Sequence, residues 1–209
     1  MNSEQIAVTC SHLRLMTTRG ELGQAIAAIV LTYSPRDLEL MRWNFSEAVR
    51  EIHPELRKIL EESITGHLFG TYQALRVMNQ QGSFLPMEEP LATGTGDFWK
   101  MVQAQCRAGN NFRLRFLKFL LAGFCMFVQK LPGHPVGMPF PGGDKVAVID
   151  GVYYCPVREK ANDVDAALCP FCPALQTPEI GYLNPPVNGS RNRKQEFIRN
   201  CYDHHHFNG

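Results

Sequence analysis

The chain of 209 residues lacks several features that would assign a protein quickly to a class. Its formal net charge is only +1, so no strong field attracts nucleic acid or an anionic membrane. The longest apolar run, residues 116–131, is interrupted by Lys118 and Gln129 and is too short to span a bilayer. Residues 1–16 lack the basic-then-apolar order of a signal peptide. We therefore expect a cytoplasmic protein that binds neither nucleic acid nor a membrane.

Familiar catalytic motifs are missing as well. The sequence has no phosphate-cradling glycine motif, no dinucleotide fingerprint and no nucleophile elbow. Its seven cysteines are an odd number and a poor disulfide framework for a chain of this length. Cys10, Cys106 and Cys125 lie in apolar helical stretches, where a thiol usually acts as a small hydrophobic group. Only the cysteines of the C-terminal third need another explanation.

Residues 1–131 have the pattern of α-helices. Ser34 to Asp37 form a helix start, with a capping hydroxyl, a proline at the first position and an acid near the positive end. Thr18 and Glu21 resemble a capping box, and Pro54 begins another helix. Spacings of three and four residues give the Pro54 helix an apolar stripe, made of Leu56, Ile59, Leu60, Ile64, Leu68, Tyr72 and Leu75.

Two more helices are predicted after the Gly- and Pro-rich loop at residues 82–96. The first is expected to begin with Asp97 as its cap and to run through Cys106. The second is expected to begin with Asn110 or Asn111 as its cap and to run through Leu131. The second helix is apolar nearly all round beyond Arg115, which predicts a central position. His67 lies on the apolar side of its helix, and we expect a core histidine bonded to a neighbour.

The pattern changes near residue 131. Two β-rich runs, 145–149 and 152–155, flank Asp150 and Gly151, a pair suited to a type I′ hairpin turn. Asn162 or Asp163 could then cap a short helix through Leu168. We expect a mainly α fold, with a helical bundle-like region at 1–131 and a Pro/Gly/Cys-rich region at 132–209. The second region is expected to contain a small C-terminal β-hairpin and a metal-stapled irregular segment. The two regions are expected to form one integrated domain.

The most informative motif is C-x13-C-x2-C, formed by Cys155, Cys169 and Cys172, with His134 upstream in a Pro/Gly-rich loop. A CxxC lets two thiolates converge on one ion, and the hairpin can return Cys155 toward His134. These four residues can form a tetrahedral Cys3His zinc site. The fourth position is open, and the competitors of His134 are Cys201, His204, His205 and His206.

Zinc as a structural staple is favoured, because this third of the chain has few aliphatic residues and much proline and glycine. Structural zinc supplies apparent binding energies on the order of 10–16 kcal/mol. An Fe–S cluster is the main competitor, since Pro156, Pro170 and Pro173 each follow a cysteine directly. The cysteine spacing matches neither standard ferredoxin pattern, and no βαβ pattern supports a thioredoxin-type pair.

Three blocks carry a resemblance to a known family: HPVGMPFPGG at 134–143, YYCPV at 153–157 and ALCPFCP at 167–173. They resemble an archaeal family, found mainly in methanogens, catalogued as domain of unknown function 2115 and as uncharacterised protein family 0305. The resemblance implies an archaeal, cytoplasmic protein without an established activity. A link to methanogen metabolism would rest on distribution alone.

We therefore expect a non-enzymatic accessory or interaction protein that holds a structural zinc and serves an unidentified protein partner. An Fe–S or redox protein is the second hypothesis. A metal-dependent enzyme ranks last, because no convincing general base lies beside the cysteines in the sequence.

Overall fold

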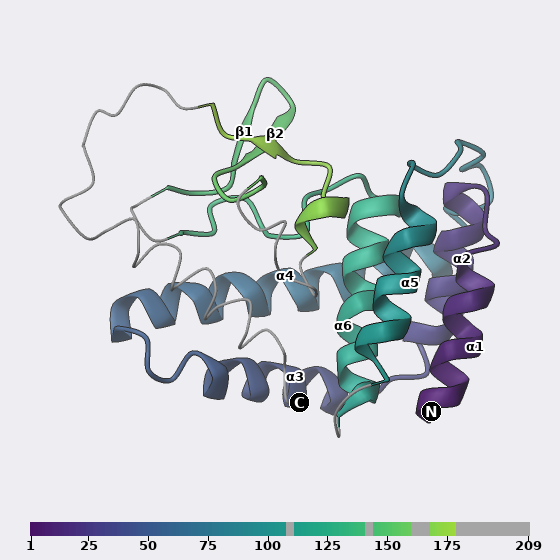
Figure 1. Cartoon of the computed structure of the whole chain (residues 1–209), viewed down its shortest axis with the longest axis horizontal. Helices are drawn as coiled ribbons and strands as arrows, with labels where there is room; N and C mark the ends of the chain where they lie inside the picture. Colours follow the sequence, from purple (N-terminus) through teal and green to yellow (C-terminus); the bar gives the residue numbers. More distant parts are fainter. Residues whose placement is uncertain (108–110, 141–143, 160–167, 179–209) are drawn as a thin grey trace.

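The computed structural model describes residues 1–107, 111–140, 144–159 and 168–178 (Figure 1). Cys201 and His204 to His206 lie outside these residues, as does nearly all of the short helix predicted to end at Leu168. The described helices are α1 (Ser3–Leu13), α2 (Arg19–Val30), α3 (Pro35–Ala48), α4 (Pro54–Gln80), α5 (Thr95–Gln105) and α6 (Phe112–Gly123). None of the helices in these ranges is both long and apolar enough to cross a membrane.

Helices α2 and α3 begin at their predicted capping residues. At α3 the carboxylate of Asp37 accepts hydrogen bonds from the backbone N–H and the hydroxyl of Ser34, at 2.8 and 2.9 Å. At α2 the hydroxyl of Thr18 and the side chain of Glu21 form the predicted capping box. The predicted cap at Asp97 is wrong. Gly94, with a φ of 94°, ends the loop earlier, and α5 therefore begins at Thr95.

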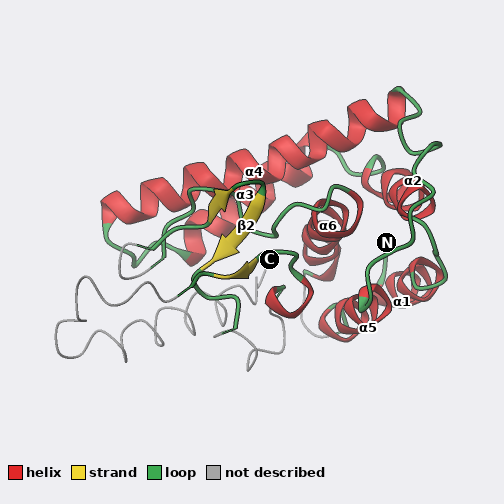
Figure 2. Cartoon of the chain, turned by 90° about the horizontal axis from the view of Figure 1, so that it is seen from above, coloured by secondary structure: helices red, strands yellow, loops and turns green. Residues whose placement is uncertain are grey.

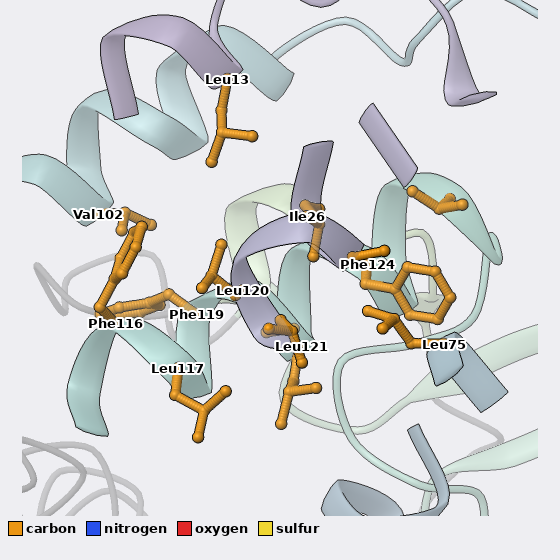
Figure 3. Close-up of a cluster of buried hydrophobic side chains, with 14 of the residues drawn as sticks. Leu13, Ile26, Leu75, Val102, Phe116, Leu117, Phe119, Leu120, Leu121 and Phe124 are labelled. Carbon is orange, nitrogen blue, oxygen red and sulfur yellow. The ribbon is translucent and has the colours of Figure 1, made fainter. Parts of the chain in front are cut away.

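Helix α6 lies at the centre of the bundle, as its apolar sequence predicted. It contacts the other five α-helices, and Figure 2 shows α1, α2 and α5 on one side of it and the sheet on the other. Figure 3 shows α6 side chains such as Leu120 and Leu121 near Ile26 of α2, in a buried cluster that also contains Leu13 of α1 and Leu75 of α4. We call this buried cluster the main core. Burying one such side chain contributes about 1.5–3 kcal/mol.

The regular part of α6 is shorter than predicted. It continues as a π-helical turn, Phe124–Val128, which we call the π-turn. The N–H of Gln129 bonds the carbonyl of Phe124 at 3.0 Å, five residues back, and Lys130 then takes a left-handed φ of 59°. The helix therefore ends before Leu131.

A three-stranded sheet follows, with β1 (Ala147–Ile149), β2 (Val152–Cys155) and β3 (Leu175–Gln176) in that order. Strands β1 and β2 form the predicted hairpin, and Asp150 and Gly151 both have the positive φ that its turn requires. Strand β3 pairs parallel to β2, which the sequence did not predict. Between β2 and β3 lies a 3₁₀ turn, Cys169–Phe171, which we call the CxxC turn.

A second, smaller cluster, the small core, joins the sheet to α3 and the first half of α4. Its buried members are Phe45, Val49, Leu60, Met138, Phe140, Val146, Cys155, Val157, Cys169 and Ala174. Ile59 was predicted on the apolar stripe of α4, but its side chain is 47% exposed. It lies one position before the buried Leu60 and so points away from both cores.

Candidate functional site

The structure gathers the three predicted cysteines at the end of the sheet. Cys155 ends β2, and Cys169 and Cys172 lie at either end of the CxxC turn, where the N–H of Cys172 bonds the carbonyl of Cys169 at 3.1 Å. Cys155 and Cys169 are buried in the small core, and Cys172 packs against it. The pKa of the Cys155 thiol is raised to about 12, mainly by burial; the nearby Cys169 and Cys172 add to the rise, and a hydrogen bond with the Val157 backbone opposes it. The three sulfurs therefore occupy one neighbourhood.

Arg158 anchors the CxxC turn beside β2. Its guanidinium donates to the carbonyl oxygens of Cys172 and Ala174, at 3.2 and 3.1 Å, and also to that of Pro170 at 3.4 Å. The N–H of Thr177 bonds the carbonyl of Cys155 at 3.1 Å. The positive charge of Arg158 acts to lower the pKa of the Cys155 thiol, but burial outweighs it and the thiol stays protonated near neutral pH.

His134 lies near this neighbourhood, but its imidazole is placed against other groups. The N–H of the preceding residue, Gly133, donates to the sulfur of Cys172 at 3.4 Å. The His134 ring meets Phe140 edge-on, with centroids 6.0 Å apart. Burial lowers the pKa of His134 to about 4, with further contributions from His67 and Lys118.

Lys118, on α6, is half-buried and adds a cationic group to this side of the bundle. Burial lowers the pKa of its amine to about 7, and the nearby charge of Arg115 adds to the effect. Burial of the imidazole, with the nearby His67 and Lys118, holds His134 neutral near pH 7, the form in which a histidine can bind a metal.

The structure adds two residues that sequence reasoning assigned to the hydrophobic core. Cys125 in the π-turn has its sulfur 3.9 Å from Nε2 of His67 on α4, and its thiol donates to the carbonyl of Pro132 at 3.3 Å. Burial raises the pKa of Cys125 to about 12, and Cys172 contributes to the rise. The pKa of His67 is lowered overall because burial lowers it more than a hydrogen bond with the backbone of Gly133 raises it.

We call His67, Cys125 and Cys172 the junction group, because they lie where the helical bundle meets the C-terminal segment. Their positions in the chain are far apart and follow no motif spacing, so no signal in the sequence could have joined them. Within the described residues, no three His, Cys, Asp or Glu side chains already stand in an arrangement that could hold a metal ion. A metal would have to displace thiol protons and draw its ligands together.

A separate hollow of about 490 Å³ lies between the end of α1 and the start of α5. Its charged residues are Arg14, Asp97 and Lys100. Asp97 pairs with Lys100 at 2.7 Å, and this bond, together with the nearby Arg14, lowers the pKa of the carboxyl. The cationic charge there is already partly compensated, so we assign the hollow no role.

Comparison with known proteins places the chain in a family. The family described as "Uncharacterized protein conserved in archaea (DUF2115)" matches residues 18–177. The chain belongs to DUF2115. The matched range contains the junction group, His134 and all three cysteines of the C-x13-C-x2-C motif.

Relatives of this DUF2115 chain come from methanogens and carry the name UPF0305 protein. The one from Methanopyrus kandleri is 43% identical over 61 residues, which are 29% of this chain and 43% of the relative. One from Methanothermobacter thermautotrophicus is 52% identical over 52 residues, 25% of this chain and 34% of the relative. Both matches therefore span less than half of the relative's length.

A longer match is to the UPF0305 protein of Methanocaldococcus jannaschii, which is 22% identical over 162 residues. These residues are 77% of this chain and 97% of the relative. No solved structure matches the chain.

Proposed function

We propose that this DUF2115 protein is a non-enzymatic metal-binding protein whose zinc ion is structural. The observation that carries the proposal is the gathering of Cys155, Cys169 and Cys172 at one buried end of the sheet. The predicted ligands are these three thiolates and the imidazole of His134. With its C-terminal segment held by the ion, the protein would act as an accessory or interaction protein for a protein partner.

The C-terminal segment has little regular secondary structure in the described residues. Strand β3 has two residues and the CxxC turn has three. Three thiols concentrated in so small a core are better explained by metal binding than by packing, because aliphatic side chains would bury more apolar surface. Zinc bound to such a segment would contribute on the order of 10–16 kcal/mol of apparent binding energy.

Elemental analysis of anaerobically purified, untagged protein tests this proposal. We expect about one zinc per chain, and we expect Cys169→Ser to lose the zinc and to melt at a lower temperature. Cys10→Ser is the matched control, because Cys10 is also buried but lies in the main core. Wild-type protein that binds no zinc, or a Cys169→Ser variant with unchanged zinc content and melting temperature, would contradict the proposal.

An Fe–S cluster is the second candidate, and one contact favours it. The N–H of Gly133 donates to the sulfur of Cys172, and bonds of this kind tune the potential of cluster ligands. Protein with a cluster would be brown after anaerobic purification and would contain several irons per chain. A colourless, iron-free preparation rejects this candidate.

A further inference from the structure

One face of the sheet is apolar and exposed. The opposite face packs on the small core through Tyr153 and Cys155, and Figure 1 shows α3 and α4 on that side. Because side chains alternate along a strand, Val152 and Tyr154 face the other way. The register of the three strands places the partners of these two residues on the same face. We call this set the outer face: Ala147, Ile149, Val152, Tyr154 and Leu175.

The composition of the outer face is unusual for a face in water. None of its five residues carries a charge, and Ile149 is 56% exposed, Leu175 54% and Val152 39%. A solvated sheet face usually bears polar side chains, whereas a contiguous apolar patch marks a contact surface. Neither buried core of the described ranges includes a residue of the outer face. Its partner is therefore a part of the chain outside those ranges or another molecule.

The chain continues from the edge of this face. The described residues end at Pro178, two positions after the last residue of β3. Residues 179–209 follow, and within them residues 196–203, which we call the tail segment, have the sequence pattern of an amphipathic helix. The apolar positions of the pattern fall on one side: Phe197, Ile198, Cys201 and Tyr202. The polar positions fall on the other: Glu196, Arg199, Asn200 and Asp203.

The connection to the tail segment is long enough to reach the outer face. About 18 residues separate the segment from Pro178, and an extended stretch of that length spans about 60 Å. The outer strands of a three-stranded sheet lie only about 10 Å apart. A segment tethered in this way has an effective concentration of up to the order of millimolar. A second copy of the chain, or a separate protein at lower concentration, must therefore bind the same face far more tightly to compete.

We propose that the tail segment packs its apolar side on the outer face of the same chain. The contact joins aromatic and aliphatic side chains of the segment to aliphatic side chains of the sheet, and it removes both from water. The sheet then has helices on both faces, which is a common way to cover a sheet that is apolar on both sides. This inference goes beyond the proposed function and does not depend on zinc.

Thiol labelling of the full-length protein tests the proposal. Val152→Cys places a thiol on the outer face, and mass spectrometry with peptide fragmentation follows the reaction of position 152 with a maleimide. We expect this reaction to be at least about tenfold faster when the tail segment also carries Phe197→Asp and Ile198→Asp, because carboxylates are costly to bury in an apolar contact. Asn200→Asp, on the polar side, is the matched control and should leave the rate unchanged.

Equal rates at position 152 with and without the two aspartates overturn the proposal. Protection that rises with protein concentration also overturns it, because that dependence assigns the outer face to a second copy of the chain. Val8→Cys on α1, where Val8 is 67% exposed, reports the rate of an uncovered thiol and should not respond to the aspartates. If Val152→Cys fails to fold, Ile149→Cys on the same face repeats the measurement.

Discussion

Gly20 provides a direct test of how helix α2 meets the loop that follows α4. An alanine Cβ at this position would lie 2.3 Å from the carbonyl oxygen of Phe84 and 2.9 Å from that of Met87. Real Cβ atoms essentially never come within 3.0 Å of another heavy atom, so the Phe84 backbone would have to move by at least the difference of 0.7 Å. That movement would disturb the bond from the N–H of Gly20 to Met87, which is 2.9 Å long.

Overpacking of this kind costs about 1–3 kcal/mol, and the weakened hydrogen bond about 1 kcal/mol more. Alanine returns about 0.5–1 kcal/mol as the better helix former. We therefore expect Gly20→Ala to lower the free energy of unfolding by about 1–3.5 kcal/mol. For a chain of this size the melting temperature should fall by about 2–14 °C.

Gly66 in α4 is the matched control, because an alanine Cβ there would meet no atom within 4 Å. Gly66→Ala should raise the free energy of unfolding by about 0.5–1 kcal/mol. Urea unfolding followed by circular dichroism measures both variants. If Gly20→Ala were as stable as Gly66→Ala, the close approach of α2 to the 84–87 loop would be wrong.

Two further predictions concern charged groups in the bundle. Arg19 donates through Nε to the carbonyl of Val128, at 2.9 Å, and pairs with the half-exposed Glu89. Arg19→Ala leaves the end of the π-turn unsatisfied and should lower the free energy of unfolding by about 2–3 kcal/mol, whereas Glu89→Ala should cost less than about 1 kcal/mol. Equal losses in urea titrations would show that the ion pair carries the effect. Burial alone would raise the pKa of Asp37, but hydrogen bonds from Arg113 and Ser34 lower it overall. Its stabilisation is therefore complete above the unfolded pKa of about 4 and is lost as pH falls through the lower folded pKa. Asp37→Asn should be less stable than wild type at neutral pH and converge with it in acid, and a constant difference in unfolding free energy across that range would refute this.

Much of the fold could be predicted because its signals are local. The caps at Ser34 and Thr18, the start at Pro54 and the turn at Asp150–Gly151 each depend on residues a few positions apart. The start of α5 was mispredicted because a left-handed glycine, three residues before a usable capping acid, is hard to distinguish from a loop glycine.

The candidate site could be predicted only in part. Cys155, Cys169 and Cys172 stand out in the sequence because thiols in a Pro/Gly-rich segment are poorly explained by packing. Cys125 and His67 do not stand out, because a cysteine and a histidine on apolar helix faces are the usual contents of a core. The structure distinguishes them by the 3.9 Å contact between their side chains.

The sequence by itself determined the mainly helical character, the starts of α2, α3 and α4, the hairpin and the family, because capping, periodicity and motif spacing act over short stretches of chain. It also singled out the cysteines that we propose bind a metal. Only the tertiary structure decided what lies beside those cysteines. Packing of the C-terminal segment on α4 and the π-turn brings Gly133 and Cys172 next to His67 and Cys125. Contacts between residues so far apart in the chain arise from the burial of two cores against each other, and no local pattern encodes them.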